Sequence, residues 1–474
     1  MRRCIPLVKG FLLPGMLVFF LSGCTTLSQD SGFSAVQSLT PIGTKLKWIR
    51  SENDAANTEA AIAPLLTKTL TVDDTETIAL LNNKGLQASY AELGIAEANL
   101  VQAGRIPNPT LSFGHLTRGG EQEIERTLML PILNLLTMPI STRIEKRRFE
   151  QAQLQTAIEV LRIADETRRS YFSAVAAAET VKYMEKVTAA AEAGSQLAQR
   201  MNAVGNWSAL QQAREQSFYT DATVQLVRAR QTYQSEREKL IRLMGLGSKT
   251  LTFQLPDRLP ELPKNPKTLT DAETIGLQNR LDILMAKREL AGLADSLHLT
   301  NTTRFINLLD VSYLHNSVNE SPSRQTGYKI ELQIPLFDWG SARVAKAEAL
   351  YMQAVNRAAE ITINAHSEIR EAYLNYHSAY NLAKHYRDEV VPLKKRISDE
   401  QLLRYNGMLI SVFELLADSR EQAMTVNASI EALRDYWMAD SALQMALTGR
   451  SSTLRSEGSN RSIDQGDQRL PTTH

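Results

Sequence analysis

The chain has 474 residues, 43% of them hydrophobic, and a formal net charge of +1. A nearly neutral chain is a poor ligand for a polyanion, which argues against nucleic acid as a partner. The two cysteines, Cys4 and Cys24, both precede residue 25, so the later sequence offers no disulfide and no thiolate ligand.

The first 23 residues are typical of a lipoprotein signal peptide. Arg2, Arg3 and Lys9 supply positive charge, and an apolar core that is too short for a membrane span follows from Phe11 to Leu21. Leu21-Ser-Gly-Cys24 reads as a lipobox, which predicts a covalent lipid such as palmitate on Cys24. The alternative is an ordinary signal peptide with an incidental cysteine. Threonine rather than aspartate after Cys24 favours the outer membrane.

After this signal there is no apolar run of about 18 residues, so any membrane crossing by this chain must use β-strands. Residues 24–70 lack periodicity and are expected to be extended. Helices are expected over about 74–103 and 270–299, two segments that align without gaps, Thr77-Ile78 falling on Thr274-Ile275. Further helices are expected over about 208–245 and 411–448. The spacing indicates an internal two-fold repeat.

Each repeat also contains a β-rich stretch. Candidate strands cover about 108–117, 123–132, 303–317 and 325–337, lengths that suit bilayer-spanning strands of about 9–11 residues. A soluble, half-buried strand would show the same alternation of apolar and polar residues. Four strands are too few to close a transmembrane barrel, because known single-chain barrels start at about 8. If these strands span the membrane, several copies of the chain must share one barrel.

A long helix follows each pair of strands and is expected to run to about Val204 in the first repeat and from about 340 to 404 in the second. Apolar or small residues in the second run alternate at spacings of three and four, as in a coiled coil. The economical arrangement stacks the two shorter helices of a repeat end to end beside the long one.

Both long helices are expected to stop at a glycine, Gly205 and Gly407, in the left-handed conformation. The next helices should then open with capping boxes, Ser208 with Gln211 and Ser411 with Glu414. These hairpins would present two tips at one end of the molecule. The predicted organisation is a signal peptide (1–23), a lipidated extended segment (24–70), a first repeat (71–250), a Pro-rich linker (251–269), a second repeat (270–449) and a disordered tail (450–474).

Three short motifs, in this order after a lipobox, carry a family resemblance. They are Arg105-Ile-Pro-Asn-Pro-Thr-Leu111, Ile334-Pro-Leu-Phe-Asp-Trp-Gly340 and the turn Tyr405-Asn-Gly407. Together with the repeat spacing they resemble the TolC family of outer-membrane efflux proteins, over residues from about 70 to 448.

The resemblance implies an α+β membrane protein that forms a homotrimer in the outer membrane of a Gram-negative bacterium. Four strands per protomer would close a shared transmembrane β-barrel of twelve strands, and a long α-helical barrel would project into the periplasm. Pro131 and Pro335 would mark the passage from strand to helix. The chain would be a passive, gated conduit of a tripartite efflux system, beside a periplasmic adaptor and an inner-membrane transporter such as an RND or ABC pump.

Adaptors would dock at the helical tips, and the tip residues expected to contact them are Gly205, Asn206, Ser208, Asn406, Gly407 and Ser411. In some family members inward-facing aspartates close the tip just after the second hairpin. Here Ala417 stands at one such position, so Glu414 and Asp418 are the gate candidates. A capping role for Glu414 and a solvated position for Asp418 are the plainer alternatives.

Two other functions stay open on the sequence. The same conduit could serve type I protein secretion, or the chain could be a non-conducting periplasmic coiled-coil spacer. No nucleophile elbow, phosphate loop or paired carboxylates point to an enzyme. His366, His377 and His385 lack accompanying ligands, so neither a metal nor any cofactor besides the lipid on Cys24 is expected.

Overall fold

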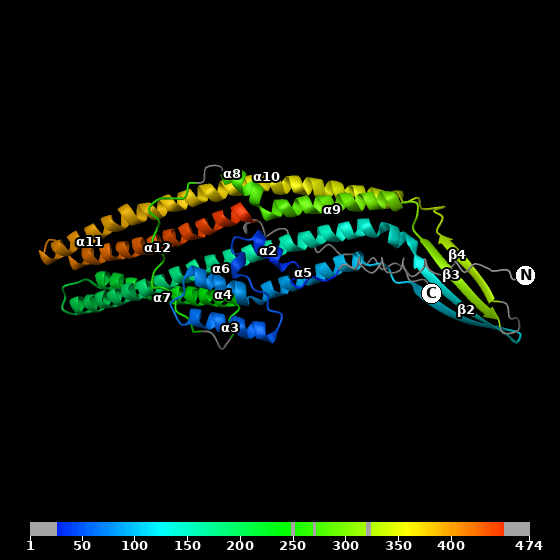
Figure 1. Ribbon diagram of the computed structural model, residues 1–474. Helices are drawn as coiled ribbons and strands as arrows, with labels where there is room; N and C mark the ends of the chain where they lie inside the picture. Colours follow the sequence, from blue (N-terminus) through cyan, green and yellow to red (C-terminus); the bar gives the residue numbers. More distant parts are fainter. Residues whose placement is uncertain (1–25, 248–251, 269–271, 319–323, 450–474) are drawn as a thin grey trace, which may run out of the picture. The chain divides into compact units, whose positions relative to one another are not determined.

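The computed structural model describes residues 26–247, 252–268, 272–318 and 324–449 (Figure 1). The predicted signal peptide, Cys24 with its lipid, and the predicted disordered tail lie outside these residues. Over the described residues the chain is mostly helical with one sheet of four strands. Within these segments, no helix is both long enough and apolar enough to cross a bilayer.

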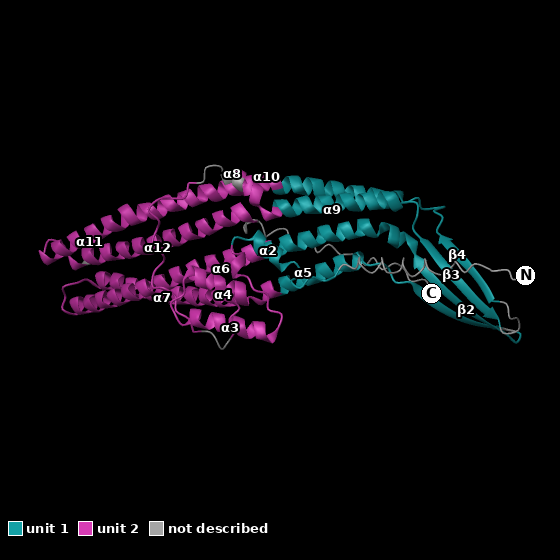
Figure 2. Ribbon diagram, viewed as in Figure 1, with its two compact units in different colours: residues 1–41, 88–157, 283–361 teal, residues 42–87, 158–282, 362–474 magenta. Residues whose placement is uncertain are grey.

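The chain divides into two compact units (Figure 2). Unit 1 comprises the described residues up to Pro41, with Ala88–Ala157 and Ile283–Ile361. Unit 2 comprises Ile42–Gln87, Ile158–Asp282 and the described residues from Thr362 onward. The sheet belongs to unit 1, and the tips of both helical hairpins belong to unit 2.

The expectation of an extended segment over residues 24–70 is wrong for much of that stretch. It contains the helix α2 (Phe33–Leu39), a 3-10 turn (Gly43–Lys45) and the helix α3 (Glu52–Leu66). The helix α3 begins at a reciprocal capping box between Ser51 and Asp54. The helix α2 is held by a tertiary contact, because the Phe33 ring meets the Tyr90 ring edge-on with centroids 4.9 Å apart. Such contacts leave no periodic signal in the sequence.

The first short helix of each half is confirmed in position but contains a break. The first consists of α4 (Val72–Asn82) and α5 (Lys84–Ala103), and the second consists of α8 (Ala272–Asn279) and α9 (Leu281–Thr303). The breaks fall at Asn83 and Arg280, residues that aligned with each other in the sequence.

The two break residues make equivalent contacts with the last turn of another helix. Asn83 Nδ2 donates to the carbonyl of Leu243 at 2.9 Å, near the end of α7 (Ala209–Met244). Arg280 Nη1 donates to the carbonyl of Ala446 at 3.2 Å, near the end of α12 (Val412–Thr448). The last carbonyls of a helix have no partner within that helix. These side chains supply the missing donors, and each therefore joins two helix ends.

The sheet is antiparallel with the strand order β1-β2-β3-β4. Its strands are β1 (Thr110–Arg118), β2 (Glu121–Pro131), β3 (Leu309–Val318) and β4 (Arg324–Leu332). The central pair β2 and β3 joins the two halves of the chain, with Pro131 opposite Asp310. The outer edges of β1 and β4 have no strand partner among the described residues, and every residue of β4 is exposed.

Two strand boundaries differ from those expected. The third strand was expected from residue 303, but α9 continues to Thr303 and β3 begins at Leu309. The fourth strand ends at Leu332 rather than near 337. Pro335 follows in the segment before α10, where its missing N–H cannot serve a sheet ladder. Pro131 is the last residue of β2, and the next helix begins at Ile132.

The long helix of the first half, α6 (Ile132–Ala203), is one continuous run. The long helix of the second half was expected to be continuous but is not. It consists of α10 (Ser341–His385), a π-helical turn η3 (Tyr386–Val390) and α11 (Val391–Asn406). The N–H of Val391 donates to the carbonyl of Tyr386, five residues earlier, and this bond defines the wider turn.

The core of unit 2 has an apolar part and an aromatic part. Tyr171 and Phe172 of α6 pack with Leu240, Ile241 and other apolar side chains at the end of α7. Tyr376, Tyr380 and Tyr436 form the aromatic part between α10 and α12. These contacts join α6, α7, α10 and α12.

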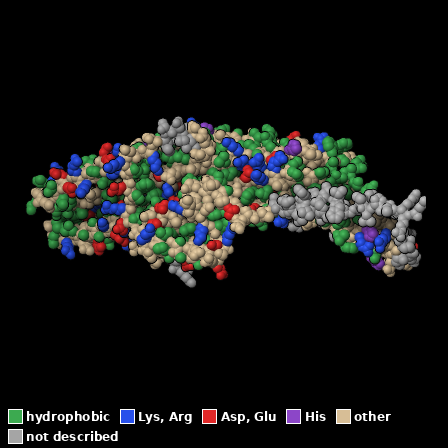
Figure 3. Space-filling view, viewed as in Figure 1, with side chains coloured by type: hydrophobic (Ala, Val, Ile, Leu, Met, Phe, Trp, Pro, Cys, Tyr) green, Lys and Arg blue, Asp and Glu red, His purple; other side chains and the backbone are tan. Residues whose placement is uncertain are grey.

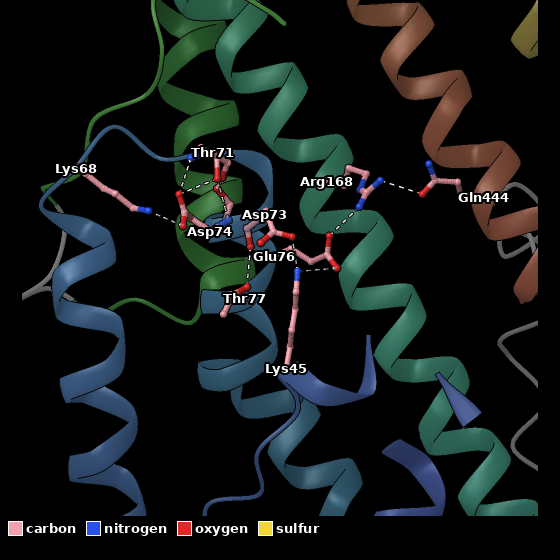
Figure 4. A network of polar contacts seen from close by, with 10 residues as sticks. Lys45, Lys68, Thr71, Asp73, Asp74, Glu76, Thr77, Arg168 and Gln444 are labelled. Carbon is pink, nitrogen blue, oxygen red and sulfur yellow. Dashed lines mark hydrogen bonds and ion pairs between the residues drawn. The ribbon is translucent and has the colours of Figure 1, made fainter. Parts of the chain in front are cut away.

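A polar network crosses the same unit (Figure 4). Glu76 of α4 is only 1% exposed, and its Oε2 accepts from Arg168 Nη2 of α6 at 2.9 Å. Arg168 Nη1 also donates to Gln444 Oε1 of α12 at 2.9 Å. Lys45 Nζ lies 3.9 Å from the other carboxylate oxygen of Glu76. The buried charge of Glu76 is thereby balanced, and α4, α6 and α12 are connected through it.

Candidate gating site at the helical tips

The first helical tip connects α6 to α7 within unit 2 and follows the expected pattern. Gly205 has a φ of 76°, in the left-handed region, and the N–H of Asn206 donates to the carbonyl of Met201 at 2.9 Å. Ser208 and Gln211 form the reciprocal capping box that opens α7. The expected glycine stop and capping box are both confirmed here.

The second tip connects α11 to α12 and differs from the expectation in two ways. Gly407 has a φ of −80°, and the left-handed residue is instead Met408, with a φ of 60°. Ser411 Oγ accepts from the N–H of Glu414 at 3.3 Å, but no bond returns from the Glu414 side chain to the Ser411 backbone. The capping box is therefore half formed. Asn406 is the last residue of α11.

A left-handed methionine is unusual, because a side chain with a Cβ is strained in that region. Met408 is also 93% exposed, and the neighbouring Leu409 is 77% exposed. Two apolar side chains therefore stand in solvent at the end of this hairpin. At the first tip, Val204 and Leu210 are exposed in the same way.

The two gate candidates occupy different environments. Glu414 is exposed in the first turn of α12. Asp418 lies one turn later and is half-buried, and its Oδ2 is buried without a hydrogen-bond partner in the described part of the chain. The expectation that Asp418 is a solvated residue is therefore wrong for that oxygen. A buried carboxylate oxygen without a donor is costly.

An ion pair between the two hairpins lies next to these candidates. Arg420 Nη2 of α12 contacts Glu215 Oε1 of α7, and Glu215 is only 1% exposed. The guanidinium also lies over the Phe218 ring, 4.6 Å from its centroid. Leu416 approaches α6 so closely that a methyl group on Gly194 would lie 3.5 Å from it. Sequence reasoning missed this pair, because the spacing of the two residues along the chain carries no signal.

Two other polar side chains of unit 2 have defined contacts. Burial raises the pKa of Asp165 on α6, and Ser441 Oγ of α12 donates to its Oδ1 at 2.7 Å. The His377 ring packs edge-on against Tyr373 with centroids 4.5 Å apart. Across the described ranges, no group of three or more histidine, cysteine, aspartate or glutamate side chains is placed to hold a metal ion.

Comparison with known proteins gives one curated relative. No family model matches the chain. The cobalt-zinc-cadmium resistance protein CzcC of Cupriavidus metallidurans is 28% identical over 200 residues. That match covers 42% of this chain and 47% of CzcC, so the chain spans about half the length of this relative.

Solved structures match over a larger part of the chain. CusC has a TM-score of 0.66 at 16% identity, covering 80% of this chain and 92% of that one. OprN, an outer-membrane channel, has a TM-score of 0.69 at 17% identity, covering 80% and 90%. The outer-membrane channel CmeC of Campylobacter jejuni has a TM-score of 0.66 at 18% identity, covering 80% and 85%.

These three structures are of channel proteins and not of enzymes. The likeness covers about four fifths of this chain in each comparison. The resemblance to the TolC family is therefore confirmed at the level of the fold: the chain has the architecture of these outer-membrane channels.

Proposed function

We propose that this chain is the outer-membrane channel of a tripartite efflux system and works as a homotrimer. Its two halves would be copies of one unit, and four strands from each protomer would close a common barrel. A periplasmic adaptor and an inner-membrane pump of the RND or ABC type would complete the assembly. The observation that carries the proposal is a sheet of four strands with two free edges.

The free edges favour assembly because unpaired N–H and C=O groups are not tolerated in lipid. The exposed side chains of β4 include large apolar ones, with Tyr328 81% and Ile330 61% exposed. Phe113 of β1, at the other edge, is also exposed. If β1 of one copy pairs with β4 of the next, the backbone N–H and C=O groups at every edge gain partners. The apolar side chains then face lipid.

Exposed apolar side chains near the strands support the same arrangement. Phe337 and Trp339 stand exposed in the segment between β4 and α10, and Leu136 stands exposed in the first turns of α6. Figure 3 shows hydrophobic side chains at the surface of unit 1 where α9 and α10 approach the strands. A soluble monomer rarely exposes so many large apolar groups together.

The helices would form the periplasmic conduit. Met352, Ile363 and Leu374 of α10 are exposed at intervals of eleven residues, about three helical turns. Such a stripe on one face of a long helix suits packing against a neighbouring helix. We assign this contact to a second copy of the chain.

The gate would lie at the helical tips. Asp418, supported by Glu414, would form a ring of negative charge near the threefold axis, which would pass cations more readily than anions. The ion pair of Arg420 with Glu215 would hold the two hairpins of each protomer together while the channel is closed. An adaptor would dock on the exposed tips, including Met408 and Leu409, and would separate the hairpins.

The conduit would be passive, and the inner-membrane pump would supply the energy. The lipid on Cys24 would anchor the chain in the outer membrane beside the barrel, with its helices in the periplasm. No other cofactor is proposed.

Two measurements test the channel proposal. The purified protein should run as a trimer on an unboiled gel and as a monomer after boiling, because a shared barrel resists detergent. It should also give small or rare single-channel openings in a planar bilayer. A folded protein that runs as a monomer and never conducts would favour the coiled-coil spacer.

The relative CzcC favours one class of cargo, since it is named for resistance to cobalt, zinc and cadmium. We propose divalent metal cations as cargo. Deleting the gene should then lower the tolerated concentration of these metals more than that of organic antibiotics. If the deletion lowers the tolerance of organic antibiotics more than that of the metals, the proposal of a metal cargo is wrong. The channel proposal is unaffected by that result.

A further inference from the structure

The two faces of the four-stranded sheet carry different side chains. Residues opposite each other in an antiparallel pair lie on the same face, and successive residues along a strand lie on opposite faces. The register therefore places Leu111, Leu128, Tyr313 and Tyr328 in one row that crosses all four strands. The face that carries this row is here called the apolar face.

The apolar face is most apolar near the helices. Leu309 lies opposite Leu332 in the row next to the helix ends, and Val311 lies opposite Ile330 in the following row. Ile330 and Leu332 are 61% and 51% exposed, and Phe337, just after β4, is exposed as well. Hydrocarbon chains of a membrane would cover this part of the sheet.

Basic side chains appear on the same face in the two rows nearer the hairpin turns of the sheet. Arg126 of β2 lies opposite His315 of β3. The next row contains His115 of β1 and Arg324 of β4. Figure 3 shows histidine and basic side chains at the surface of the strands. These side chains are here called the basic band: His115, Arg126, His315 and Arg324.

The basic band has no acidic partner on its own face. Within the strands, the register places every acidic residue on the opposite face, where Lys329 pairs with Glu331 at 2.9 Å. Across the described segments, no side chain of the basic band makes a hydrogen bond or an ion pair. The acidic residues of the opposite face are Glu121, Glu123, Glu125, Asp310 and Glu331.

A neighbouring copy in the proposed barrel would not neutralise the band either. The strand beside β4 would be β1 of the next copy, which brings Leu111, Phe113, His115 and Thr117 to this face. None of these residues is acidic. The negative charge that balances Arg126 and Arg324 must therefore come from outside the protein.

The height of the basic band matches the far boundary of a bilayer. Along β4, Thr326 in the row of Arg126 is six residues from Leu332, and Arg324 is eight. At about 3.4 Å per residue these rows lie roughly 20 and 27 Å along the strand. A strand tilt of about 40° lowers the heights to roughly 16 and 21 Å, against an apolar belt of about 25 Å. Arginine can extend its guanidinium over the remaining few ångströms.

An arginine at this height gains most from a phosphate. The guanidinium is always charged and is costly within hydrocarbon, but it can bind a phosphate through two parallel hydrogen bonds. The imidazoles of His115 and His315 add further N–H donors beside Arg126 and Arg324. The band extends from β1 to β4, about 14 Å at the usual spacing of strands. One headgroup with several phosphates can span that width.

We propose that the basic band binds the phosphates of a multiply phosphorylated glycolipid in the outer leaflet, whose acyl chains cover the apolar rows. The proposal rests on the proposed function, because only a sheet embedded in the membrane turns this face to lipid. The outer leaflet is assigned because the helices, which join the opposite end of the sheet, would lie in the periplasm.

The band is tested by measuring lipid binding to the intact protein with native mass spectrometry in a neutral detergent. The probes are diphosphoryl lipid A, the same lipid without its phosphates, and phosphatidylglycerol, whose phosphodiester carries one charge. We expect diphosphoryl lipid A to bind at least about tenfold more tightly than either of the others, because charge-assisted hydrogen bonds to phosphate are strong.

Arg126→Gln combined with Arg324→Gln removes both guanidinium groups and keeps polar side chains. The affinity for diphosphoryl lipid A should then fall about tenfold. The double lysine variant at the same positions keeps the charges without the paired donors and should have an intermediate affinity. His115→Gln combined with His315→Gln should cause a smaller loss. Lys329→Gln, on the opposite face of β4, is the matched control and should leave the affinity unchanged.

Three results would overturn the proposal. The first is equal binding of lipid A with and without phosphates. The second is equal binding of phosphatidylglycerol and diphosphoryl lipid A, which would rule out recognition of several phosphates. The third is a loss of affinity in Lys329→Gln as large as that in the double glutamine variant.

Trimer formation on an unboiled gel and conductance in a phosphatidylcholine bilayer are measured for every variant, independently of lipid A. A trimer that conducts but binds all three lipids equally would lose the basic band and keep the proposed channel. A folded chain that neither forms a trimer nor conducts, yet prefers diphosphoryl lipid A through Arg126 and Arg324, would lose the proposed function and keep the lipid site.

Discussion

Arg420 of α12 sets its guanidinium against the buried carboxylate of Glu215 on α7, so one ion pair bridges the two hairpins close to their tips. Glu215 is almost inaccessible to solvent, whereas the Arg420 side chain is 25% exposed. The carboxylate is therefore the partner that depends on the pair. If the pair is broken, Arg420 still contacts solvent and the Phe218 ring.

Replacing Arg420 with alanine should destabilise unit 2 more than replacing Glu215 with glutamine. The first change leaves a buried charge unpaired, at a cost of about 3–5 kcal/mol. The second keeps a hydrogen-bond acceptor and removes the charge. Thermal unfolding followed by circular dichroism gives the order of the two variants, and equal midpoints would contradict it.

The pair of Arg230 with Glu185 is the matched control for that comparison. It also joins α7 to α6, at 2.8 Å, but both side chains are about half exposed. Exposed pairs contribute about 0–1 kcal/mol. Arg230→Ala should therefore leave the unfolding midpoint almost unchanged.

Asp418→Ala should make channel openings larger or more frequent than in the unsubstituted protein. The buried Oδ2 of Asp418 has no donor among the described residues, so the carboxylate is costly where it stands. Removing it removes the charge of the proposed ring. Single-channel recording and the ratio of cation to anion permeability are the measurements.

Glu414→Ala serves as the comparison, because this side chain is exposed and does not complete its capping box. We expect a smaller effect than that of Asp418→Ala, and the double variant should exceed both. If the conductance is the same in all three variants as in the unsubstituted protein, these residues do not form the gate.

Asp165→Asn should stabilise the protein more at about pH 8 than at about pH 4. Burial raises the pKa of Asp165 above its ordinary value of 3.8, so the folded state favours the protonated form. The contribution of this group to stability is present below 3.8 and is lost as the pH rises through the raised pKa. Asparagine keeps an acceptor for Ser441 without the charge.

The opposite sign is expected for Asp388→Asn. Arg387 holds the pKa of Asp388 below its ordinary value, so the carboxylate stabilises the fold above that value, and the contribution is lost on acidification. Both predictions are tested by measuring the unfolding midpoint of each variant between about pH 4 and about pH 8. The Asp165 prediction fails if its variant follows the same trend as the Asp388 variant.

Gly340→Ala should weaken the connection between β4 and α10. Gly340 has a φ of 73°, and a Cβ there would lie 2.7 Å from the carbonyl oxygen of Arg304. The left-handed conformation alone costs a non-glycine residue about 1–2 kcal/mol. The yield of heat-stable trimer on an unboiled gel is the readout. Gly327→Ala, in open space within β4, is the control and should leave the yield unchanged.

The sequence predicted the elements that depend on local and periodic signals. Helix ends with a glycine or a Ser-x-x-Gln pattern, such as Gly205 and Ser208, were located correctly because capping is a local property of the backbone. Helix breaks were missed at Asn83 and Arg280. The donors there serve carbonyls about 160 residues away along the chain, and no local pattern encodes such a partner.

The candidate site was less predictable than the fold. Glu414 and Asp418 were singled out from the resemblance, but the difference in their burial depends on packing between helices. The pair of Glu215 and Arg420 depends on the approach of two hairpins that are 205 residues apart in sequence. The π-turn at Tyr386–Val390 also escaped notice, because its apolar spacing remains compatible with a continuous helix.

The free edges of the sheet have a consequence for biogenesis. In a newly made chain, the outer edges of β1 and β4 carry unpaired backbone N–H and C=O groups. Any extended peptide that the chain meets can pair with these edges. In the proposed trimer, the lifetime of a single subunit would therefore be short, or the sheet would form only when three chains meet. Assembly rate would then rise steeply with subunit concentration, and overproduction without sufficient membrane would yield aggregate rather than more channel.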